Sequence, residues 1–326
     1  MGHQNRTILI ALFALVSMMP AVAAAQQAFP TKPIHIILPF PPVGGPDLTM
    51  RRTATELQSR MGQPVVVDNR PGGNFVIGAE ACRRASADGY TLCYITSTQL
   101  SINPYVLKEV PYDPEKDFRP VTNLYSFVGG TFVNAKLPVN TLAELESYVR
   151  ARPGKINYPT HGPNSGTDIQ RRWLNERWRA DMVGIGYKGG PDMLTALVTG
   201  DVHLAVIGIA SGLAQLNAKA VKVLAVDSQA RYPLFPEVPT YQESGITEWP
   251  LVPWHGFSYQ SAVPDPIVRR INTEVVRLYK EPEFGKFLVS QGFEVMVGTP
   301  EEFAAYARKD RVVTEALIRK FNIPRE

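Results

Sequence analysis

Residues 33–73 constrain the fold more than any other part of this 326-residue chain. They begin with an almost continuous apolar run at 34–38, which is typical of a parallel strand that is buried on both faces. A Pro/Gly loop at 40–47 follows, and apolar residues then recur on one helical face from Met50 to Met61. A second apolar run at 65–67 completes a strand–helix–strand unit. The stretch predicts an α/β fold in which a loop connects the carboxyl end of a strand to the amino end of a helix, the place where open sheets bind ligands.

The alternation of strands and helices continues towards the carboxyl terminus. Asp265 is followed by a proline, and Thr299 and Glu302 have the spacing of a capping box, so both places predict helix starts. We therefore expect two doubly wound α/β halves, connected by crossings of the chain near 124–132 and 224–228. This organisation predicts a discontinuous first domain, at 26–127 and 228–326, and an inserted second domain at 128–227.

The first 25 residues predict export. Arg6 precedes a short apolar core at 8–19, and small residues at 21–25 offer A-x-A cleavage sites. This pattern is typical of a cleavable signal peptide, with cleavage near Ala25. The alternative is an uncleaved membrane anchor, but the apolar core is shorter than the ~20 residues that a span needs. We therefore expect an exported protein from which residues 1–25 are removed.

Charge and cysteine content argue against several classes of function. The chain has 34 basic and 30 acidic residues, and removal of Arg6 with the signal leaves 33 − 30, or +3. This small surplus is spread along the chain and gives no support for nucleic-acid binding. No Cys/His spacing suggests a metal site, and we expect no metal or redox cofactor. Cys82 and Cys93 fall on a predicted helix and the next strand; we expect free, buried thiols, with a disulfide as the alternative.

Four loops that follow predicted strands carry the candidate ligand contacts. They are rich in Gly, Ser, Thr, Asn or Pro, and they lie at 40–47, 96–99, 160–167 and 208–212. In the third loop, Ser165, Gly166 and Thr167 offer hydroxyl and N–H groups at a helix start, which favours a carboxylate or a phosphate. Tyr187 closes another strand and offers a pocket wall with a hydroxyl donor. Ordinary turn and cap chemistry uses the same residue types, but four such loops in one chain favour a shared cleft.

Three other patterns have competing interpretations. Residues 184–189 match G-x-G-x-x-G, but a lone match is weak evidence for a dinucleotide site in an exported protein. His161, Ser165 and Asp168 are the residue types of a hydrolytic triad, but the serine lacks a G-x-S-x-G elbow. The aromatic cluster at 254–257 either packs in a core or lines the edge of the cleft.

A series of short motifs extends over nearly the whole mature chain. In order, they are PI at 33–34, PFPP at 39–42, GG at 44–45, Asp47, GQPVVV at 62–67, DNRPG at 68–72, DGYTL at 88–92, PYD at 111–113, DF at 117–118, PGK at 153–155, YKGG at 187–190 and TPEEF at 299–303. With these motifs in this order, the chain resembles the periplasmic solute-binding proteins of tripartite tricarboxylate transporters, also called Bug-type receptors.

The resemblance implies a Venus-flytrap fold of the periplasmic-binding-protein type, with two α/β domains, a hinge and a ligand in the cleft. Family ligands are mostly organic acids, and the resemblance places the carboxylate between the first Pro/Gly loop and the facing loop of the second domain. Together with Tyr187, the expected ligand-binding residues of this chain are Phe40, Pro41, Val43, Gly44, Gly45, Asp47, Ser97, Thr98, Gly162, Asn164, Ser165, Gly166, Thr167, Gly208, Ile209 and Ala210.

The chain departs from the family pattern at three places. Val43 stands where the family usually has a glycine, which narrows the approach to the backbone or adds an apolar wall. Thr167 is followed by Asp168, where relatives often have histidine. The strand at 202–207 is followed by Gly208-Ile-Ala-Ser, where many relatives have an acid. The missing acid favours a plain or aromatic carboxylate over an amine-bearing ligand.

We therefore expect a non-enzymatic, monomeric, periplasmic receptor that captures a small organic acid, with di- or aromatic carboxylates favoured. It closes around the ligand and docks on inner-membrane carrier subunits, without a cofactor and without binding nucleic acid. Two alternatives stay open. One is a ligand-sensing subunit for a membrane signalling kinase, and the other is a periplasmic hydrolase in the same cleft, with His161 or Asp47 as the base.

Overall fold

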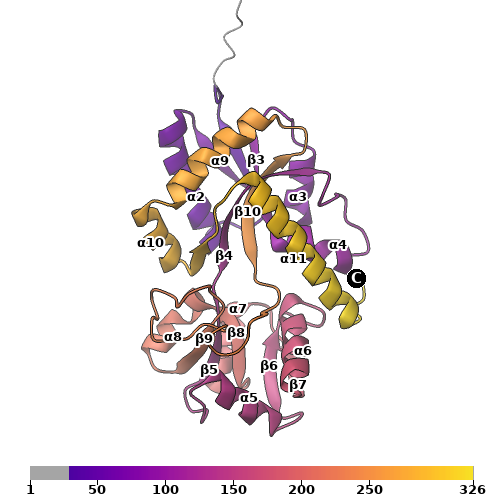
Figure 1. Ribbon diagram of the computed structural model, residues 1–326, viewed down its shortest axis with the longest axis vertical. Coiled ribbons are helices and arrows are strands. Elements are labelled where there is room, and N and C mark those ends of the chain that lie inside the picture. Colours follow the sequence, from indigo (N-terminus) through magenta and orange to yellow (C-terminus); the bar gives the residue numbers. More distant parts are fainter. Residues whose placement is uncertain (1–28, 326) are drawn as a thin grey trace, which may run out of the picture.

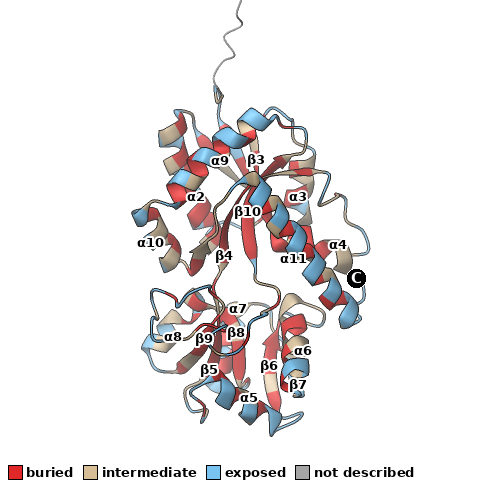
Figure 2. Cartoon of the chain, in the orientation of Figure 1, coloured by how far each residue is buried: buried red, intermediate tan, exposed pale blue. Residues whose placement is uncertain are grey.

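The chain forms two lobes with separate apolar cores, joined by extended segments (Figure 1). The computed structural model describes residues 29–325, so the predicted signal peptide lies outside the described residues. Figure 2 shows buried residues gathered inside each lobe and exposed residues on its outer helices. Within 29–325, no helix combines the length and the apolar character that a membrane span requires. The α/β class expected from the sequence is confirmed.

The upper lobe is built on a six-stranded sheet that combines the two ends of the chain. Its order is β11-β4-β10-β3-β1-β2, in which β1 is parallel to β2 and β3, and β10 runs antiparallel between β3 and β4. The strands are β1 Ile34–Leu38, β2 Val65–Asn69, β3 Thr91–Thr96, β4 Phe118–Phe127, β10 Trp254–Gln260 and β11 Phe293–Val295. Because β10 inserts between β3 and β4, which both come from the first half of the chain, this lobe is discontinuous in sequence.

Helices cover both faces of this sheet. They are α2 Gly45–Met61, η1 Gly73–Phe75, α3 Val76–Arg83, η2 Thr98–Ile102, α4 Asn103–Val106, α9 Asp265–Tyr279, α10 Pro282–Ser290 and α11 Pro300–Lys320. In α2, the predicted apolar face from Met50 to Met61 is buried in the same cluster as β1. The predicted capping box of α11 is confirmed, because Thr299 Oγ1 accepts from Glu302 N and Glu302 Oε2 accepts from Thr299 N.

The lower lobe is smaller and combines two sheets. A three-stranded sheet has the order β8-β5-β9 with antiparallel pairing, and β6 and β7 form a parallel pair. The strands are β5 Gly129–Asn134, β6 Ile156–Thr160, β7 Met182–Gly186, β8 Leu204–Gly208 and β9 Val221–Val226. The helices are α5 Leu142–Arg150, α6 Gly166–Trp178, α7 Gly190–Thr199, η3 Ile209–Gly212 and α8 Leu213–Asn217. The central strand β5 follows directly after β4 of the upper lobe, and both of its neighbours, β8 and β9, are antiparallel to it.

The segment after β9 packs with the lower lobe. Tyr232, Val238, Tyr241 and Ile246 are buried in the two apolar clusters of that lobe. The sequence placed the return to the first domain at 228. The division into domains remains a prediction, and this packing favours a second boundary near the start of β10.

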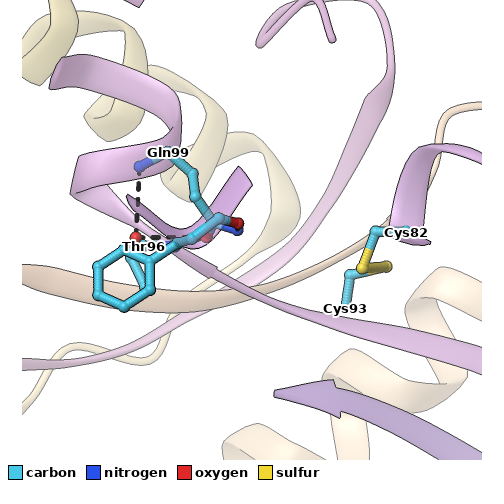
Figure 3. Close-up of a disulfide and its surroundings, with 5 residues drawn as sticks. Cys82, Cys93, Thr96 and Gln99 are labelled. Atoms are coloured by element: carbon cyan, nitrogen blue, oxygen red, sulfur yellow. Dashed lines mark hydrogen bonds between the residues drawn. A yellow bond between two sulfur atoms is a disulfide. The ribbon is translucent and has the colours of Figure 1, made fainter. Parts of the chain in front are cut away.

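The two cysteines form a disulfide, contrary to the expectation of free thiols. The Cys82–Cys93 bond links α3 to β3, with a Cα–Cα distance of 5.8 Å (Figure 3). Both residues are buried, as expected, but α3 packs on the face of β3 to which Cys93 points. Sequence periodicity showed that both side chains face an apolar interior, and it could not show that they face each other.

Candidate ligand-binding cleft

Two adjoining cavities lie between the lobes. The first, here called the central cavity, has a volume of about 340 Å³. It lies against the connection between β4 and β5 at Phe127 and Gly129, here called the hinge. Its lining residues are Phe40, Phe75, Thr96, Ser97, Thr98, Phe127, Gly129, His161, Thr167, Gln170, Gly190, Met193, Val206, Ile207, Gly208, Ser211, Asp227, Pro253 and His255. The second, here called the side cavity, has a volume of about 670 Å³ and shares Ser97, Thr98, His161 and Thr167 with the first. The two cavities therefore form one cleft with contributions from both lobes.

The upper wall combines hydroxyl donors with aromatic rings. Ser97 and Thr98 follow the end of β3, and the turn is held by Gln99 Oε1, which accepts from Thr96 N at 2.9 Å (Figure 3). The rings of Phe40 and Phe75 pack with centroids 4.8 Å apart. This wall offers a polar end and an apolar face to a ligand.

The lower wall is the loop between β6 and α6. His161 N donates to Thr167 Oγ1 at 2.9 Å, and Ser165 Oγ donates to Gly162 O at 2.7 Å. The Ser165 side chain also caps α6, where it accepts from Asp168 N. These bonds fix Thr167 at the start of α6, where free N–H groups and the helix dipole favour an anion.

The two loops that face the cleft share one internal arrangement. Val43 and Asn164 both have positive φ angles, 71° and 64°. In each loop the N–H of this residue donates to a buried aspartate four positions later: Val43 N to Asp47 Oδ2 at 3.0 Å, and Asn164 N to Asp168 Oδ2 at 3.2 Å. The aspartates therefore hold loop shape rather than contact a ligand.

Both of these aspartates are already paired within the protein. Burial acts to raise the pKa of Asp47, but hydrogen bonds from Arg51 and Asn69 outweigh it and hold the pKa below its ordinary value. Asp168 likewise accepts from Arg171 Nε and Arg172 Nε, each at 2.9 Å, and its pKa is also lowered against the effect of burial. Neither carboxylate is free to act as a general base.

The triad suggested by the sequence does not form. Ser165 Oγ donates to Gly162 O and its hydroxyl contacts Thr167, while Asp168 binds arginines rather than His161. Among residues 29–325, no hydrogen bond joins the His161 ring to either partner that a triad would need. The geometry gives no support to the hydrolase alternative.

The predicted ligand-binding residues fall into three groups. Those lining the central cavity are Phe40, Ser97, Thr98, Thr167 and Gly208. Those in neighbouring cavities are Asn164, Ser165 and Gly166, in the side cavity, and Gly45, Ile209 and Ala210, in a third cavity of about 300 Å³. Those lining none of the three are Pro41, Val43, Gly44, Asp47, Gly162 and Tyr187.

The structure explains why two of the predicted residues, Val43 and Tyr187, line none of the three cavities. The side chain of Val43 is 86% exposed and extends into solvent, because its N–H is held by Asp47. Tyr187 packs against the apolar cluster that includes Met193 instead of pointing to the cleft. Neither arrangement was visible in the sequence, since both depend on how a loop turns after its strand.

Several lining residues were not predicted. They include Phe75, Phe127, Gly129, Gln170, Met193, Ser211, Asp227 and His255. His255 belongs to the aromatic cluster at 254–257 and lies at the cleft edge, where burial lowers its pKa to about 3. Asp227 directly follows β9, so the rule that selected the other loops, a polar residue after a strand, would have found it.

The lobes also contact each other beside the cleft. Lys320 Nζ lies 2.8 Å from Glu176 Oε1, and Arg172 Nη1 donates to Phe321 O at 3.3 Å. Ile169 of α6 packs in one cluster with the end of α11. These contacts join α6 of the lower lobe to α11 of the upper lobe (Figure 1).

Comparisons with known proteins agree on one family. The family model described as "Tripartite tricarboxylate transporter family receptor" matches residues 49–323. Protein BugT of Bordetella pertussis is 29% identical over 91% of this chain and 92% of its own. The structure of R. palustris Rpa4515 with adipate is 27% identical, with a TM-score of 0.77, over 91% of this chain and all of that one. MatC of Rhodopseudomonas palustris, with bound malate, is 25% identical, with a TM-score of 0.70, over 89% of this chain and all of that one.

Proposed function

The chain belongs to the tripartite tricarboxylate transporter receptor family, and from this premise we propose that it captures one small organic acid in the central cavity and delivers it to inner-membrane carrier subunits. Family receptors are periplasmic solute-binding proteins, and the fold is the two-lobed one of that class. The signal peptide expected at residues 1–25 would export the protein, as a periplasmic receptor requires. Capture selects a closed state, because the ligand contacts both lobes only when they are together.

The observation that carries this proposal is the convergence of neutral donors from both lobes. Ser97 and Thr98 face the central cavity from above, and Thr167 and Ser211 face it from below. Of the described residues that line it, none is lysine or arginine. A carboxylate bound here is held by hydroxyl and N–H dipoles, which form charge-assisted hydrogen bonds.

The remaining walls suit the carbon skeleton of the ligand. Phe40, Phe75, Phe127 and Met193 provide apolar surface beside the donors. Either a methylene chain or an aromatic ring fits this lining, in agreement with the aromatic or dicarboxylic acids expected from the sequence. Micromolar affinity requires only ~8 kcal/mol, which a few charge-assisted hydrogen bonds and apolar burial can supply. The adipate and malate seen with two neighbours support acids of this size.

We propose that the protein has no catalytic activity. The loop carboxylates Asp47 and Asp168 are paired with arginines. Burial lowers the pKa of His161, whose Nδ1 lies 3.4 Å from Thr167 Oγ1 and has no carboxylate partner among the described residues. A general base needs a positioned proton acceptor within reach of its substrate, and the residues expected from the sequence to act as bases, His161 and Asp47, do not have that arrangement.

A thermal-shift panel tests the proposal on the mature protein. The acids are hexanoate, adipate, malate, benzoate and nicotinate, and putrescine serves as a cationic control. At 100 times Kd, a ligand of the native state adds about 2.7 kcal/mol, which raises Tm by roughly 5 °C for a chain of this size. At least one acid should give this shift and should be recovered unchanged after long incubation. Stabilisation by putrescine alone would contradict the proposal, and conversion of the acid would support the hydrolase.

A matched pair of threonine variants locates the binding. Thr167→Val removes a hydroxyl from the central cavity, and the affinity for the best acid should fall by about tenfold. Thr195→Val removes an exposed hydroxyl on α7, away from the cleft, and should leave the affinity unchanged. Equal effects of the two substitutions would place the ligand elsewhere.

Uptake of labelled acid by membrane vesicles that contain the carrier separates delivery from signalling. Receptor-dependent uptake is expected. Binding of the acid without any effect on uptake would favour the sensor alternative.

A further inference from the structure

The carboxyl end of β9 brings an acid to the hinge. Asp227 N donates to Gly129 O at 3.0 Å, and Gly129 N donates to Asp227 Oδ1 at 2.6 Å. On the other side of β5, Gly129 pairs with Gly208 of β8. Asp227 and Gly208 therefore flank the same glycine from opposite sides, and the acid lines the same cavity as Gly208 and Ser211 of the loop at 208–212, where the sequence showed none.

The Asp227 carboxyl faces the central cavity without a cation. It is the only acidic residue among the described residues that line this cavity. No ion pair involves it within residues 29–325, and the donors that its carboxyl has there are backbone N–H groups of Gly129 and of Asp227 itself. A side chain at Gly129 would collide with it, because Oδ2 lies 2.7 Å from the position of a Cβ there. The glycine thus leaves room for the carboxyl at the hinge.

The titratable groups around Asp227 do not compensate its charge. Glu294 of β11 is a second acid, and Tyr241 is neutral because burial raises its pKa. The two histidines of the cavity, His161 and His255, have pKa values lowered by burial. Burial, with Glu294 adding to it, raises the pKa of Asp227 to about 8. Asp227 is partly buried, and a carboxyl partly withdrawn from water without a cation is disfavoured in its ionised form; a bound cation would favour that form.

We infer that Asp227 forms a subsite for a positively charged nitrogen, so the ligand is an organic acid that also bears an amino group or a protonated ring nitrogen. The inference rests on the proposed function: one end of the ligand, the carboxylate, meets the hydroxyl donors of Ser97, Thr98 and Thr167, and the nitrogen meets Asp227. All of these residues line the same cavity. The missing acid at 208–212 therefore does not argue against amines, because β9, on the other side of β5, supplies an acid to the same cavity.

The subsite predicts a ranking of ligands. A dicarboxylate directs its second carboxylate at Asp227 and is repelled when that group is ionised. A plain monocarboxylate leaves Asp227 without a partner. An amino acid of the same length meets the hydroxyl donors with its carboxylate and Asp227 with its ammonium group. Because this cation lowers the pKa of the Asp227 carboxyl, that carboxyl releases a proton to the buffer on binding.

Calorimetric titration with acids of one chain length tests the inference. The probes are hexanoate, adipate, 2-aminohexanoate and 6-aminohexanoate, each titrated at neutral pH in two buffers of different ionisation enthalpy. At least one amino acid should bind the native protein roughly tenfold or more tighter than hexanoate, with proton release that hexanoate does not cause. Asp227→Asn keeps an acceptor for Gly129 N and should lose this preference and the proton release, while its affinity for hexanoate stays within about threefold.

Glu294→Gln is the matched control, because Glu294 is a neighbouring acid that does not line the cavity. It should keep the preference for the amino acid. If hexanoate binds as tightly as both amino acids, or if Asp227→Asn weakens all acids equally, the inference is wrong and the proposed function stands. If none of the four acids binds but an acid of the thermal-shift panel that lacks nitrogen does, the inference is wrong and the proposed function stands. If no acid binds at all, the proposed function fails and the subsite with it. Proton release is measured on the native protein, so the inference remains testable even if the variant does not fold.

Discussion

Val43 and Asn164 occupy equivalent places in the two loops that face the cleft, but their left-handed backbones differ in cost. Asparagine adopts positive φ readily, whereas a β-branched residue there crowds its own backbone. Val43 accepts this conformation at φ 71° because Asp47 holds its N–H. Its side chain is 86% exposed and gains little from packing in return.

Replacing this valine by glycine should stabilise the protein. Val43→Gly relieves the backbone strain at positive φ but gives the unfolded chain more conformational freedom. We expect the relief of strain to be the larger effect, so the free energy of unfolding should rise by about 1 kcal/mol. Val183→Gly is the control, because Val183 is also exposed but lies in β7 with an ordinary φ. That change should lower the free energy of unfolding by about 1 kcal/mol. Urea denaturation measures both, and a loss of stability in Val43→Gly would show that the valine is not strained.

The residues of the cleft could be predicted from sequence only in part. Ser97, Thr98 and Thr167 were found because each follows a strand directly, and strand ends meet at one edge of a sheet. Asp227 also follows a strand directly, but it was missed because the segment at 224–228 was expected to be a crossing between domains; the register of β5 with β8 and β9 places it across Gly129 from Gly208. Val43 was expected to contact the ligand, yet its loop turns that side chain into solvent.

At the scale of elements, the Cys82–Cys93 disulfide joins a helix to the strand beneath it. The bond closes a short loop, with a sequence separation of 11 residues, between α3 and β3. The same strand continues to Thr96 and the donors of the cleft. The disulfide thus fixes the helix that covers the strand leading to the site (Figure 3).

Removing the disulfide should destabilise the protein without abolishing the fold. For a loop of this length, chain entropy predicts that Cys82→Ala/Cys93→Ala lowers the free energy of unfolding by about 3 kcal/mol. A reductant should destabilise the native protein and have no effect on the double variant. If the reductant leaves the native protein unchanged in chemical denaturation, the bond does not contribute to its stability.

Local signals predicted elements better than they predicted pairing. The strand at 34–38 and the capped helix start at Thr299 appear as expected, because apolar runs and caps act within a few residues. The helix expected at Asp265 forms, but its N-cap is Pro264, and Asp265 pairs with Arg119 and Arg269 instead of capping the helix. The insertion of β10 between β3 and β4 and the antiparallel order of the lower sheet depend on contacts distant in sequence. No periodicity specifies such contacts, so the order of the strands could not be predicted from sequence, and the position of the second crossing stays a prediction.

At the scale of the whole molecule, the cleft is the feature that relates the fold to function. Each lobe has its own apolar core, and the chain first passes from the upper lobe to the lower lobe at Gly129, the start of β5. The central cavity draws donors from both lobes, and the contacts of Glu176 and Arg172 with the end of α11 join the lobes beside it. Under the proposed function, a ligand in this cavity would favour the closed arrangement by its contacts with both lobes.

The central claim is that one organic acid binds in the central cavity, and calorimetric titration of a cavity-filling variant tests it most directly. Gly208 has an ordinary φ of −56° and lines the cavity, so Gly208→Trp fills the space without backbone strain. The native protein should bind the best acid of the panel with one ligand per chain, and the variant should retain its melting transition but give no measurable binding heat. Equal affinity and stoichiometry in the variant would contradict the account.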